Sequence, residues 1–429
     1  MNFLLITKEY PPSPSVSGRI AETICCELIN AGNNVTVLTR SLVSKEAGIG
    51  KNGESLYYVR SSYWERLYKR FVAGETGKLF KIWYRIVQSI RKLILVFRIL
   101  SFPDSEPNIT KKGIGVVSHL ISDGNQYDCA IAFFRPFSCL EVLLAIKQLY
   151  GVHSIAYYLD LVESKDCPSF MPQKLYEHLI KRGDQRVFDS CDQIILPVSS
   201  QTAMNELQIQ HKDKIQYFEF PTFITREYTQ SNSKKHDNNT IVLLYAGTLS
   251  KSFRNPINML EIIDKASEYI LGDRVVLKIY GKCDCSELID DFKCGTNFTI
   301  EHHGAVSKEI IEGEYESADF LINIMNSYKS IVPSKIFELF STGKPILNFA
   351  TEGDDGSMPY FQRYPLQFTV LKNEAIQLSS QNVAQFLNEN IGKHIETDQI
   401  EREFENCTPK YIAQAIIGLA NGDNNTINF

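Results

Sequence analysis

The sequence lacks any long hydrophobic run and any strong excess of one charge. No stretch reaches the ~18 apolar residues of a membrane-spanning helix, so we predict that the chain does not cross a bilayer. Of its 429 residues, 45 are Lys or Arg and 50 are Asp or Glu, which gives a net charge of −5. This balance provides no global attraction to nucleic acid or anionic lipid, and we expect no nucleic-acid partner.

The ten cysteines show none of the paired CxxC spacings of structural zinc sites. Only the pairs at 25–26 and 283–285 are close in sequence. Residues 1–12, MNFLLITKEYPP, lack the cationic start and the apolar run of a signal peptide. We therefore expect reduced thiols in a cytoplasmic protein. A zinc site is the less favoured alternative, and its ligands would be Cys283, Cys285, Cys294, His302 and His303.

Two nucleotide and metal motifs are also missing. The turn after the first hydrophobic run contains a Pro-rich loop and no GxGxxG, which argues against a nicotinamide-dependent oxidoreductase. No convincing Asp-x-Asp motif is found, so we expect neither a divalent metal nor another cofactor.

Short hydrophobic runs alternate with longer helix-like segments along almost the whole chain. Several runs, such as FLLIT, AIAFF and IVLLYAG, are apolar without alternation, as in strands buried on both faces of a parallel sheet. The predicted strands span residues 2–7, 35–40, 56–60, 129–134, 154–159, 193–199, 215–220, 241–247, 275–281, 299–304, 319–324 and 345–350. This pattern predicts an α/β fold with doubly wound, mostly parallel sheets.

A polar segment at residues 225–240, TREYTQSNSKKHDNNT, interrupts the alternation. Its composition is that of a domain linker, and TIVLLYAGT then restarts a strand–turn–helix pattern. A chain of this length is expected to hold two or three domains. We predict Rossmann-like domains over 1–225 and 226–400, followed by a helical segment over 401–429 that can pack back on the first domain.

Residues 60–98 depart from the pattern and form a basic, amphipathic insertion that extends to about residue 103. This stretch holds ten Lys or Arg against two Glu, with aromatic and aliphatic residues interleaved. Such a stretch can lie on an anionic membrane surface. The alternative, left open here, is a pair of helices packed on the first domain with their cations in solvent.

The segment SIVPSKIFELFSTGKPILNFA, residues 330–350, contains a short predicted helix with candidate binding residues. The helix begins at Ser334 or the proline before it and ends at Gly343. The free N–H groups at its start, together with Lys335, predict a phosphate site. Glu338 shares a face with Ser334 and is placed to accept hydrogen bonds from ribose hydroxyls. An ordinary surface glutamate is the alternative.

A second candidate segment opens the second domain: LLYAGTLSKSFRNPINMLEII, residues 243–263. A predicted strand runs into Gly247, and Lys251 and Arg254 follow in the turn before the next helix. Cations and backbone amides at the carboxyl end of a parallel strand are the usual diphosphate site of a doubly wound sheet. Lys251 is also compatible with a merely solvated side chain.

Taken in order, four segments resemble the retaining, nucleotide-sugar-dependent glycosyltransferases of family four (glycosyltransferase group 1), in particular those of bacterial polysaccharide synthesis. They are FLLITKEYPPSPSVSGRIAETICCELINAGNNVTVLTR, VFDSCDQIILPVSSQTAMNEL, and the segments around Gly247 and Glu338. The resemblance implies the GT-B fold, which has two facing Rossmann-like domains. It covers both predicted domains.

The resemblance also assigns roles to individual residues. Glu338 matches the family's ribose-binding glutamate, whereas Ser330 replaces the first glutamate of the pair, near the donor sugar. Thr248 stands after Gly247, where many members have arginine. Diphosphate binding and stabilisation of the leaving group then fall to three cations: Arg254, Lys335 and Lys251.

In the first domain, Asp160 and Gly18 are the candidate residues. Asp160 ends the segment SIAYYLD, and the resemblance places it in the interdomain cleft, where it is suited to orient the acceptor hydroxyl or take its proton. A helix N-cap is the alternative. Gly18 follows the Pro-rich loop and is suited to let the backbone approach a phosphate or the acceptor. A simple helix-start turn is the alternative there.

The function implied is transfer of a sugar from a nucleoside diphosphate sugar to a saccharide or polyprenyl-linked acceptor. The resemblance implies assembly of a capsule, O-antigen or other surface polysaccharide, by an enzyme that is cytoplasmic or peripheral on the inner membrane face. The missing first glutamate leaves an alternative open, namely an inactive nucleotide-sugar-binding or scaffold protein of the same fold.

Overall fold

The chain forms two compact units, each with its own sheet. The computed structural model describes residues 1–13, 15–43, 45–72, 77–97, 101–161, 166–169, 171–219, 221, 240–270, 274–325, 332–333, 335–351 and 356–423. Unit 1 comprises Met1–Pro221 and Asn406–Phe429, and unit 2 comprises Thr222–Glu405. Most of the predicted linker at 225–240 lies outside the described residues and remains a prediction.

Unit 1 is built on a sheet of eight strands in the order β3-β4-β2-β1-β5-β6-β7-β8. All neighbours pair in parallel except β3 and β4. Its elements are β1 (Asn2–Ile6), α1 (Val16–Asn30), β2 (Asn34–Ser41), β3 (Gly48–Ile49), β4 (Ser55–Arg60), α2 (Tyr63–Val72), α3 (Lys78–Phe97), α4 (Pro107–Ser122), β5 (Cys129–Phe134), α5 (Phe137–Tyr150), β6 (His153–Tyr158), α6 (Gln173–Ser190), β7 (Gln193–Pro197), a 3₁₀ helix (Val198–Ala203), α7 (Glu206–Gln210), β8 (Ile215–Phe218) and α15 (Pro409–Ala420).

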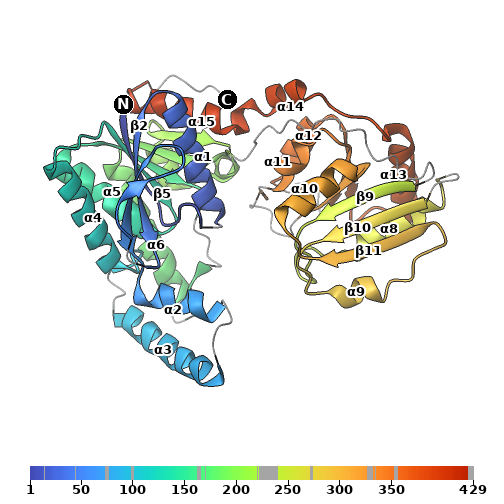
Figure 1. Cartoon of the computed structure of the whole chain (residues 1–429), viewed down its shortest axis with the longest axis horizontal. Helices are drawn as coiled ribbons and strands as arrows, with labels where there is room; N and C mark the ends of the chain where they lie inside the picture. Colours follow the sequence, from blue (N-terminus) through green and yellow to red (C-terminus); the bar gives the residue numbers. More distant parts are fainter. Residues whose placement is uncertain are drawn as a thin grey trace. The chain divides into compact units, whose positions relative to one another are not determined.

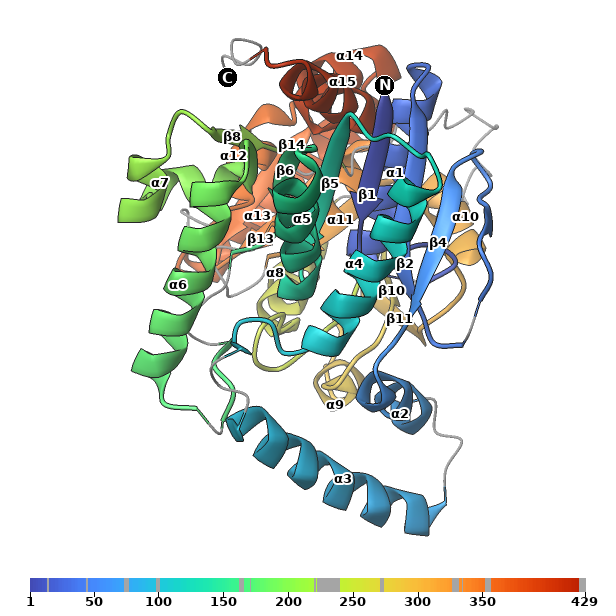
Figure 2. The same cartoon turned by 90° about the vertical axis from the view of Figure 1, so that its left-hand side faces the viewer.

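The central strands of unit 1 are buried on both faces, as their continuous hydrophobic runs predict. Along β1, Leu4 and Ile6 face a core shared with α4, α5 and α6. Phe3 and Leu5 face the other core, which α1 and α15 cover. Figures 1 and 2 show the sheet between these two helical layers. The C-terminal helix α15 thus belongs to unit 1, through buried residues such as Ile412 and Ile416.

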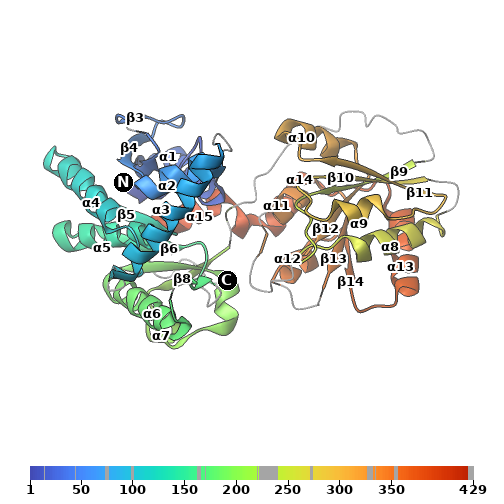
Figure 3. The ribbon, with the colours of Figure 1, turned by 90° about the horizontal axis from the view of Figure 1, so that it is seen from below.

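The basic insertion forms α2 and α3, which pack against each other. The rings of Phe71 in α2 and Tyr84 in α3 stack with centroids 4.2 Å apart. Figures 2 and 3 show α3 alongside α2, and Figure 2 shows both helices apart from the sheet of unit 1. None of the described helices is long and apolar enough to cross a membrane.

Unit 2 has a fully parallel sheet in the order β11-β10-β9-β12-β13-β14. Its elements are β9 (Thr240–Ala246), α8 (Ile257–Ser267), β10 (Arg274–Tyr280), α9 (Ser286–Asp290), β11 (Phe298–Gly304), α10 (Lys308–Ser317), β12 (Phe320–Ile324), α11 (Lys335–Phe340), β13 (Ile346–Ala350), α12 (Met358–Arg363), β14 (Gln367–Leu371), α13 (Ile376–Asn390) and α14 (Thr397–Glu403). A 3₁₀ helix (Glu405–Cys407) spans the boundary between the two units.

The two faces of the unit 2 sheet are covered differently. Helices α8 and α13 contribute aliphatic residues such as Leu260 and Val383 to the core on the sheet. Helices α11 and α12 meet in an aromatic cluster, in which Phe340 stacks on Phe404 with centroids 4.9 Å apart. Phe404 follows α14, and the chain passes from unit 2 to unit 1 between Glu405 and Asn406.

Candidate functional site

A cavity lies where the sheet of unit 2 changes its direction of winding. The strand β9 has β10 on one side and β12 on the other, and doubly wound sheets bind ligands outside the strand carboxyl ends at such a switch point. The cavity measures about 410 Å³, within the range of about 300–1,000 Å³ for small-molecule sites. Its lining comes from Lys251 to Glu261, from Ile324 and Met325, from residues 349–351 and from Lys372.

Unit 1 contains a cavity of similar size, about 470 Å³, between β4 and α4. Tyr57, Val116 and Leu120 form part of its wall. This cavity runs along the strand and helix, away from the sheet's switch point between β1 and β5. We therefore take the cavity of unit 2 as the candidate site.

Two glycines close the carboxyl ends of β9 and β10 beside this cavity. The Gly247 N–H donates to the carbonyl of Tyr280 at 2.9 Å, and Gly281 has a φ of 131°. A Cβ atom on Gly281 would lie 2.0 Å from the Gly247 carbonyl oxygen. Glycine is therefore required at 281, and this close backbone contact fixes where the turn over residues 248–254 begins.

Arg254 ends this turn and lines the cavity. Its N–H and carbonyl both pair with the backbone of Ser250, each at 3.1 Å. Burial raises the pKa of Tyr245 to about 12, although the charge of Arg254 and a side-chain hydrogen bond between the two residues act to lower it. The Arg254 Nε atom is buried without a hydrogen-bond partner among the residues that the structure describes. Because Arg254 lines the cavity, its guanidinium charge is suited to bind a phosphate there.

Lys251 and Thr248 lie on the same turn but have other contacts. The Nζ atom of Lys251 forms a 2.7 Å ion pair with Glu287 of α9, and this hydrogen bond raises the pKa of Lys251. Thr248 is exposed, and its carbonyl accepts a hydrogen bond from the Tyr245 hydroxyl at 3.1 Å. Of the two cations on this turn, Lys251 and Arg254, Arg254 is therefore the stronger candidate for binding phosphate.

The helix α11 carries Lys335 and Glu338 one turn apart and pairs them. Lys335 Nζ lies 2.7 Å from Glu338 Oε2, and both side chains are about one-third exposed, at 32%. Lys335 Nζ also lies 5.1 Å from the ring centroid of Tyr315. Within the described part of the chain, neither residue lines the 410 Å³ cavity. A ribose at Glu338 would have to share that carboxylate with Lys335.

The rest of the predicted helix frame is only partly described. Gly343 ends the helix region in the left-handed conformation, with a φ of 71°, as its sequence position predicts. A Cβ atom there would lie 2.5 Å from the carbonyl oxygen of Ile395. Ser330 and Ser334 lie outside the described residues, so their predicted contacts with the donor stay predictions.

Gly18 and Asp160 belong to unit 1. The Gly18 N–H donates to Oγ of Ser15, the N-cap of α1, at 3.0 Å. A Cβ atom on Gly18 would lie 2.9 Å from the Glu9 carbonyl oxygen, so glycine lets the loop after β1 pack against the helix start. Asp160 is exposed and lies just beyond the carboxyl end of β6. Both roles near the acceptor remain predictions.

No protein-family model and no curated protein matches this sequence. Solved structures are nevertheless similar over almost the whole chain. Sucrose-phosphate synthase from Thermosynechococcus elongatus shares 13% identity, with 98% of each chain covered and a TM-score of 0.56. The lipopolysaccharide outer core galactosyltransferase WaaB, in its apo form, shares 10% identity over 98% of this chain and 99% of its own, with a TM-score of 0.55.

A third similar structure is described as "Trehalose-6-phosphate from E. coli bound with UDP-2-fluoro glucose", with 7% identity, full coverage of both chains and a TM-score of 0.54. These structures share two Rossmann-like units. This chain has the GT-B fold. The fold predicted from the sequence is thereby confirmed, and it assigns unit 2, with its cavity, to the second Rossmann-like domain of a GT-B protein.

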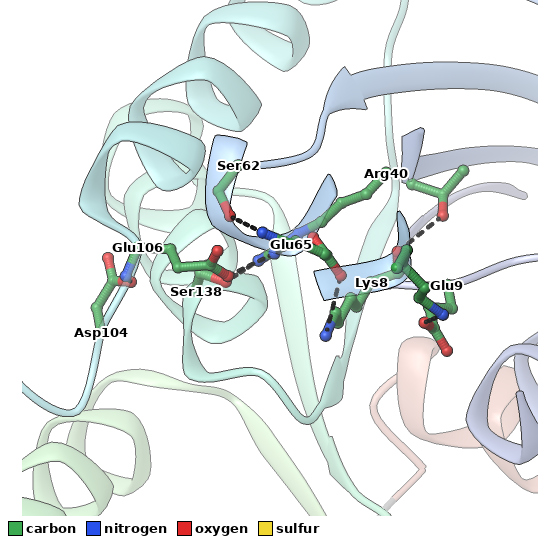
Figure 4. Close-up of polar contacts among 10 residues, drawn as sticks. Lys8, Glu9, Arg40, Ser62, Glu65, Asp104, Glu106 and Ser138 are labelled. Atoms are coloured by element: carbon green, nitrogen blue, oxygen red, sulfur yellow. Dashed lines mark hydrogen bonds and ion pairs between the residues drawn. The ribbon is translucent and has the colours of Figure 1, made fainter. Parts of the chain in front are cut away.

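In this GT-B chain, a buried ionic cluster joins α2 to the carboxyl edge of the unit 1 sheet. The guanidinium of Arg40, whose side chain is only 6% exposed, lies 2.5 Å from Glu106 and 3.7 Å from Glu65 of α2. It also donates to Ser138 Oγ at 2.5 Å, and Lys8 pairs with Glu65 at 3.2 Å. Figure 4 shows these side chains converging on Arg40. The cluster therefore attaches α2, the first helix of the basic insertion, to the sheet.

The sequence reasoning missed the residues that hold the candidate turn. Tyr245 is buried in β9 and donates to the Thr248 carbonyl. Asp284 accepts hydrogen bonds from Ser250 Oγ at 2.9 Å and from the Lys251 N–H at 3.2 Å. The only available signal for Asp284 was the close cysteine pair around it, which suggested a metal site instead.

The structure describes no metal-binding group at that pair. Among the described residues, no cluster of three or more His, Cys, Asp and Glu side chains is arranged to hold a metal ion. Instead, the Sγ atoms of Cys283 and Cys285 lie 3.7 Å from each other, and His303 stacks on Tyr280.

Proposed function

We propose that this protein is a glycosyltransferase that moves a sugar from a nucleoside diphosphate sugar to a hydroxyl acceptor, with retention of configuration. The observation that carries the proposal is the cavity at the switch point of unit 2, with Arg254 beside the Gly247 turn. The GT-B fold supports it, since the similar structures include a galactosyltransferase and a protein bound with UDP-2-fluoro glucose.

In the proposed reaction, the bond between the sugar and the diphosphate ionises. Negative charge then develops on the leaving diphosphate, and fixed positive groups stabilise it most effectively where water is excluded. We assign this role to Arg254, whose Nε donor is buried and unsatisfied among the described residues, with Lys335 in support. Glu338 would hold the ribose. Asp160 would orient the acceptor hydroxyl or accept its proton.

For the acceptor, we propose a saccharide carried on a polyprenyl lipid at the inner face of the cytoplasmic membrane, in surface polysaccharide synthesis. Helix α3 supports this proposal. Its sequence holds five Lys or Arg and no acidic residue. Ile82, Ile86 and Ile90 are exposed by 58%, 55% and 48% and share one face at a spacing of four residues. This combination suits an anionic lipid surface.

The membrane proposal predicts a large effect of the three isoleucines. Changing Ile82, Ile86 and Ile90 to serine is expected to weaken binding to vesicles of phosphatidylglycerol about 100-fold, because each would lose about 1 kcal/mol of apolar burial in the lipid. Sedimentation with vesicles measures this.

A matched control changes three isoleucines of comparable exposure, 58%, 50% and 43%, that lie on other elements: Ile209, Ile310 and Ile376. This variant is expected to bind vesicles as the wild type does. Equal losses in both triple variants, or no loss in the α3 variant, would remove helix α3 from the membrane proposal.

The function itself is tested by ligand binding and turnover. A panel of nucleotide sugars is screened by thermal shift, since a ligand at 100 times its dissociation constant adds ~2.7 kcal/mol to the stability of the folded state. The sugar donor that binds is then incubated with the protein, and release of nucleoside diphosphate is followed. Binding with no hydrolysis or transfer would favour the inactive binding protein, and no binding at all would refute the proposal.

A further inference from the structure

The turn that carries Arg254 is held from the side by the segment Cys283-Asp284-Cys285. Leu249 and Cys283 form an isolated parallel β-bridge. The Leu249 N–H donates to the carbonyl before Cys283, at 2.9 Å, and the Asp284 N–H donates to the Leu249 carbonyl at 3.3 Å. These backbone contacts join the two segments directly after the ends of β9 and β10.

The side chain of Asp284 adds two contacts to the same turn. Its Oδ2 atom accepts from Ser250 Oγ at 2.9 Å, and its Oδ1 atom accepts from the Lys251 N–H at 3.2 Å. Ser250 in turn exchanges two backbone hydrogen bonds with Arg254. The position of Arg254 therefore depends on Asp284 through one intervening residue.

Asp284 lies between two thiols that are close to each other. The Sγ atoms of Cys283 and Cys285 are 3.7 Å apart, whereas a disulfide requires about 2.05 Å. Cys283 is partly exposed and Cys285 is fully buried. Burial raises the pKa of Cys285 to about 12. Cys283 is therefore the thiol that can react first with an oxidant from solution.

We propose that Asp284 is a positioning residue for the Arg254 turn, and that oxidation of Cys283 and Cys285 to a disulfide displaces it and weakens binding of the donor diphosphate. This inference rests on the proposed function and adds a means of regulating the same site. Closing the two sulfurs from 3.7 Å to bonding distance draws their Cβ atoms together, and we expect this to move Asp284, the residue between them. Its two hydrogen bonds to the turn are then lost or lengthened.

The oxidant is a low-molecular-weight disulfide such as oxidised glutathione. The Cys283 thiolate attacks one sulfur of that disulfide, which breaks the glutathione S–S bond, releases one glutathione thiolate and leaves the other glutathione bonded to Cys283 Sγ as a mixed disulfide. Cys285 then loses its proton to solvent and attacks Cys283 Sγ, which forms the new S–S bond and releases the second glutathione. The protein gives up two electrons and two protons, and two molecules of reduced glutathione result.

The test compares the full chain after treatment with a reducing agent or with oxidised glutathione. Mass spectrometry detects loss of two hydrogen atoms from the Cys283 peptide, and calorimetry measures binding of the diphosphates of uridine, adenosine, guanosine, cytidine and thymidine. We expect oxidation to weaken the affinity for the diphosphate that binds by about tenfold, which corresponds to the loss of two ordinary hydrogen bonds. Cys283→Ser should bind like the reduced wild type under both conditions.

Two further variants separate positioning from a general loss of structure. Asp284→Ala is expected to weaken binding about tenfold without oxidant, and Asp284→Asn to recover part of it, because the amide oxygen still accepts one of the two bonds. In an Arg254→Ala background, oxidation should have no further effect. Thermal melting of each variant identifies any that fails to fold.

The outcomes distinguish the two proposals. If no diphosphate binds the reduced wild type, the proposed function fails. If one binds equally well before and after oxidation, or if no disulfide forms, the redox inference fails while the function stands. If Asp284→Ala binds like the wild type, Asp284 does not position the turn.

Discussion

Replacing Arg254 by alanine is expected to lower the rate of glycosyl transfer by about 100- to 1,000-fold, with the fold intact. Arg254 lies on the turn and lines the cavity. Its Nε atom has no hydrogen-bond partner among the described residues. Charge that develops on a leaving group in a site shielded from water depends on such a fixed donor, and removing one donor typically costs this much in rate. Steady-state kinetics with the donor identified by thermal shift measure the loss.

The matched control is Lys265→Ala in helix α8, which follows the same turn. The Lys265 side chain is 38% exposed, pairs with Glu268 and does not line the cavity, so its removal deletes one positive charge from the same unit without changing the cavity. This variant should keep wild-type kinetics. Arg254→Lys should recover only part of the activity, because an ammonium cannot reproduce the planar set of guanidinium donors. Full activity of Arg254→Ala would show that the diphosphate is bound elsewhere.

Replacing Glu106 by alanine is expected to destabilise unit 1 by about 3 kcal/mol, because the buried Arg40 guanidinium would lose its closest charged partner. The pair is 2.5 Å long, and the two side chains are only 6% and 18% exposed. Glu65 lies 3.7 Å from the Arg40 guanidinium and remains as a second partner. The expected loss of stability is therefore at the lower end of the range measured for broken buried ion pairs. The chain's two tryptophans, Trp64 and Trp83, both lie in unit 1. Their fluorescence therefore follows urea unfolding of this unit.

The control for this prediction is Glu206→Ala, which removes a carboxylate from an exposed ion pair with Lys181 in the same unit. Its urea midpoint should match that of the wild type. A Glu106→Ala midpoint equally close to the wild type would mean that the cluster does not hold α2 on the sheet.

The same cluster predicts a dependence of stability on pH. Burial alone would raise the pKa of Glu106, but the charge of Arg40 and hydrogen bonds from Arg40 and Ser62 hold it below the ordinary value of 4.5. A depressed carboxyl pKa stabilises the fold above the unfolded value, and this contribution is lost as the pH falls through the lower folded value. The difference between wild type and Glu106→Gln should therefore shrink below about pH 4.5.

Hydrophobic patterning was sufficient to predict the sheets. Every strand predicted from a continuous apolar run is present, with ends that differ by at most two residues. The pattern failed at β3 and β14 for a physical reason. Both residues of β3 are exposed, and only Val370 of β14 is buried. Edge strands of this kind carry little hydrophobic signal, and their pairing depends on the neighbouring strand.

The candidate site was only partly predictable. Gly247 and Gly343 were predicted because turns and helix ends favour glycine, and Arg254 because it is a cation at the carboxyl end of a predicted strand. The pairing of Lys335 with Glu338, and of Lys251 with Glu287, depends on which side chains tertiary packing brings together. Asp284 was missed because its side chain holds the turn after β9 from the segment after β10, a tertiary contact that no local pattern encodes.

The most direct test of the account is hydrogen–deuterium exchange of the full chain with and without the nucleoside diphosphate that it binds. Ligand at the switch point of unit 2 should slow exchange of amides in the turn at residues 247–256 and around α11, since bound groups order these segments. Exchange along the cavity between β4 and α4 should not change. Slower exchange confined to unit 1, with residues 247–256 unaffected, would contradict the proposed donor site.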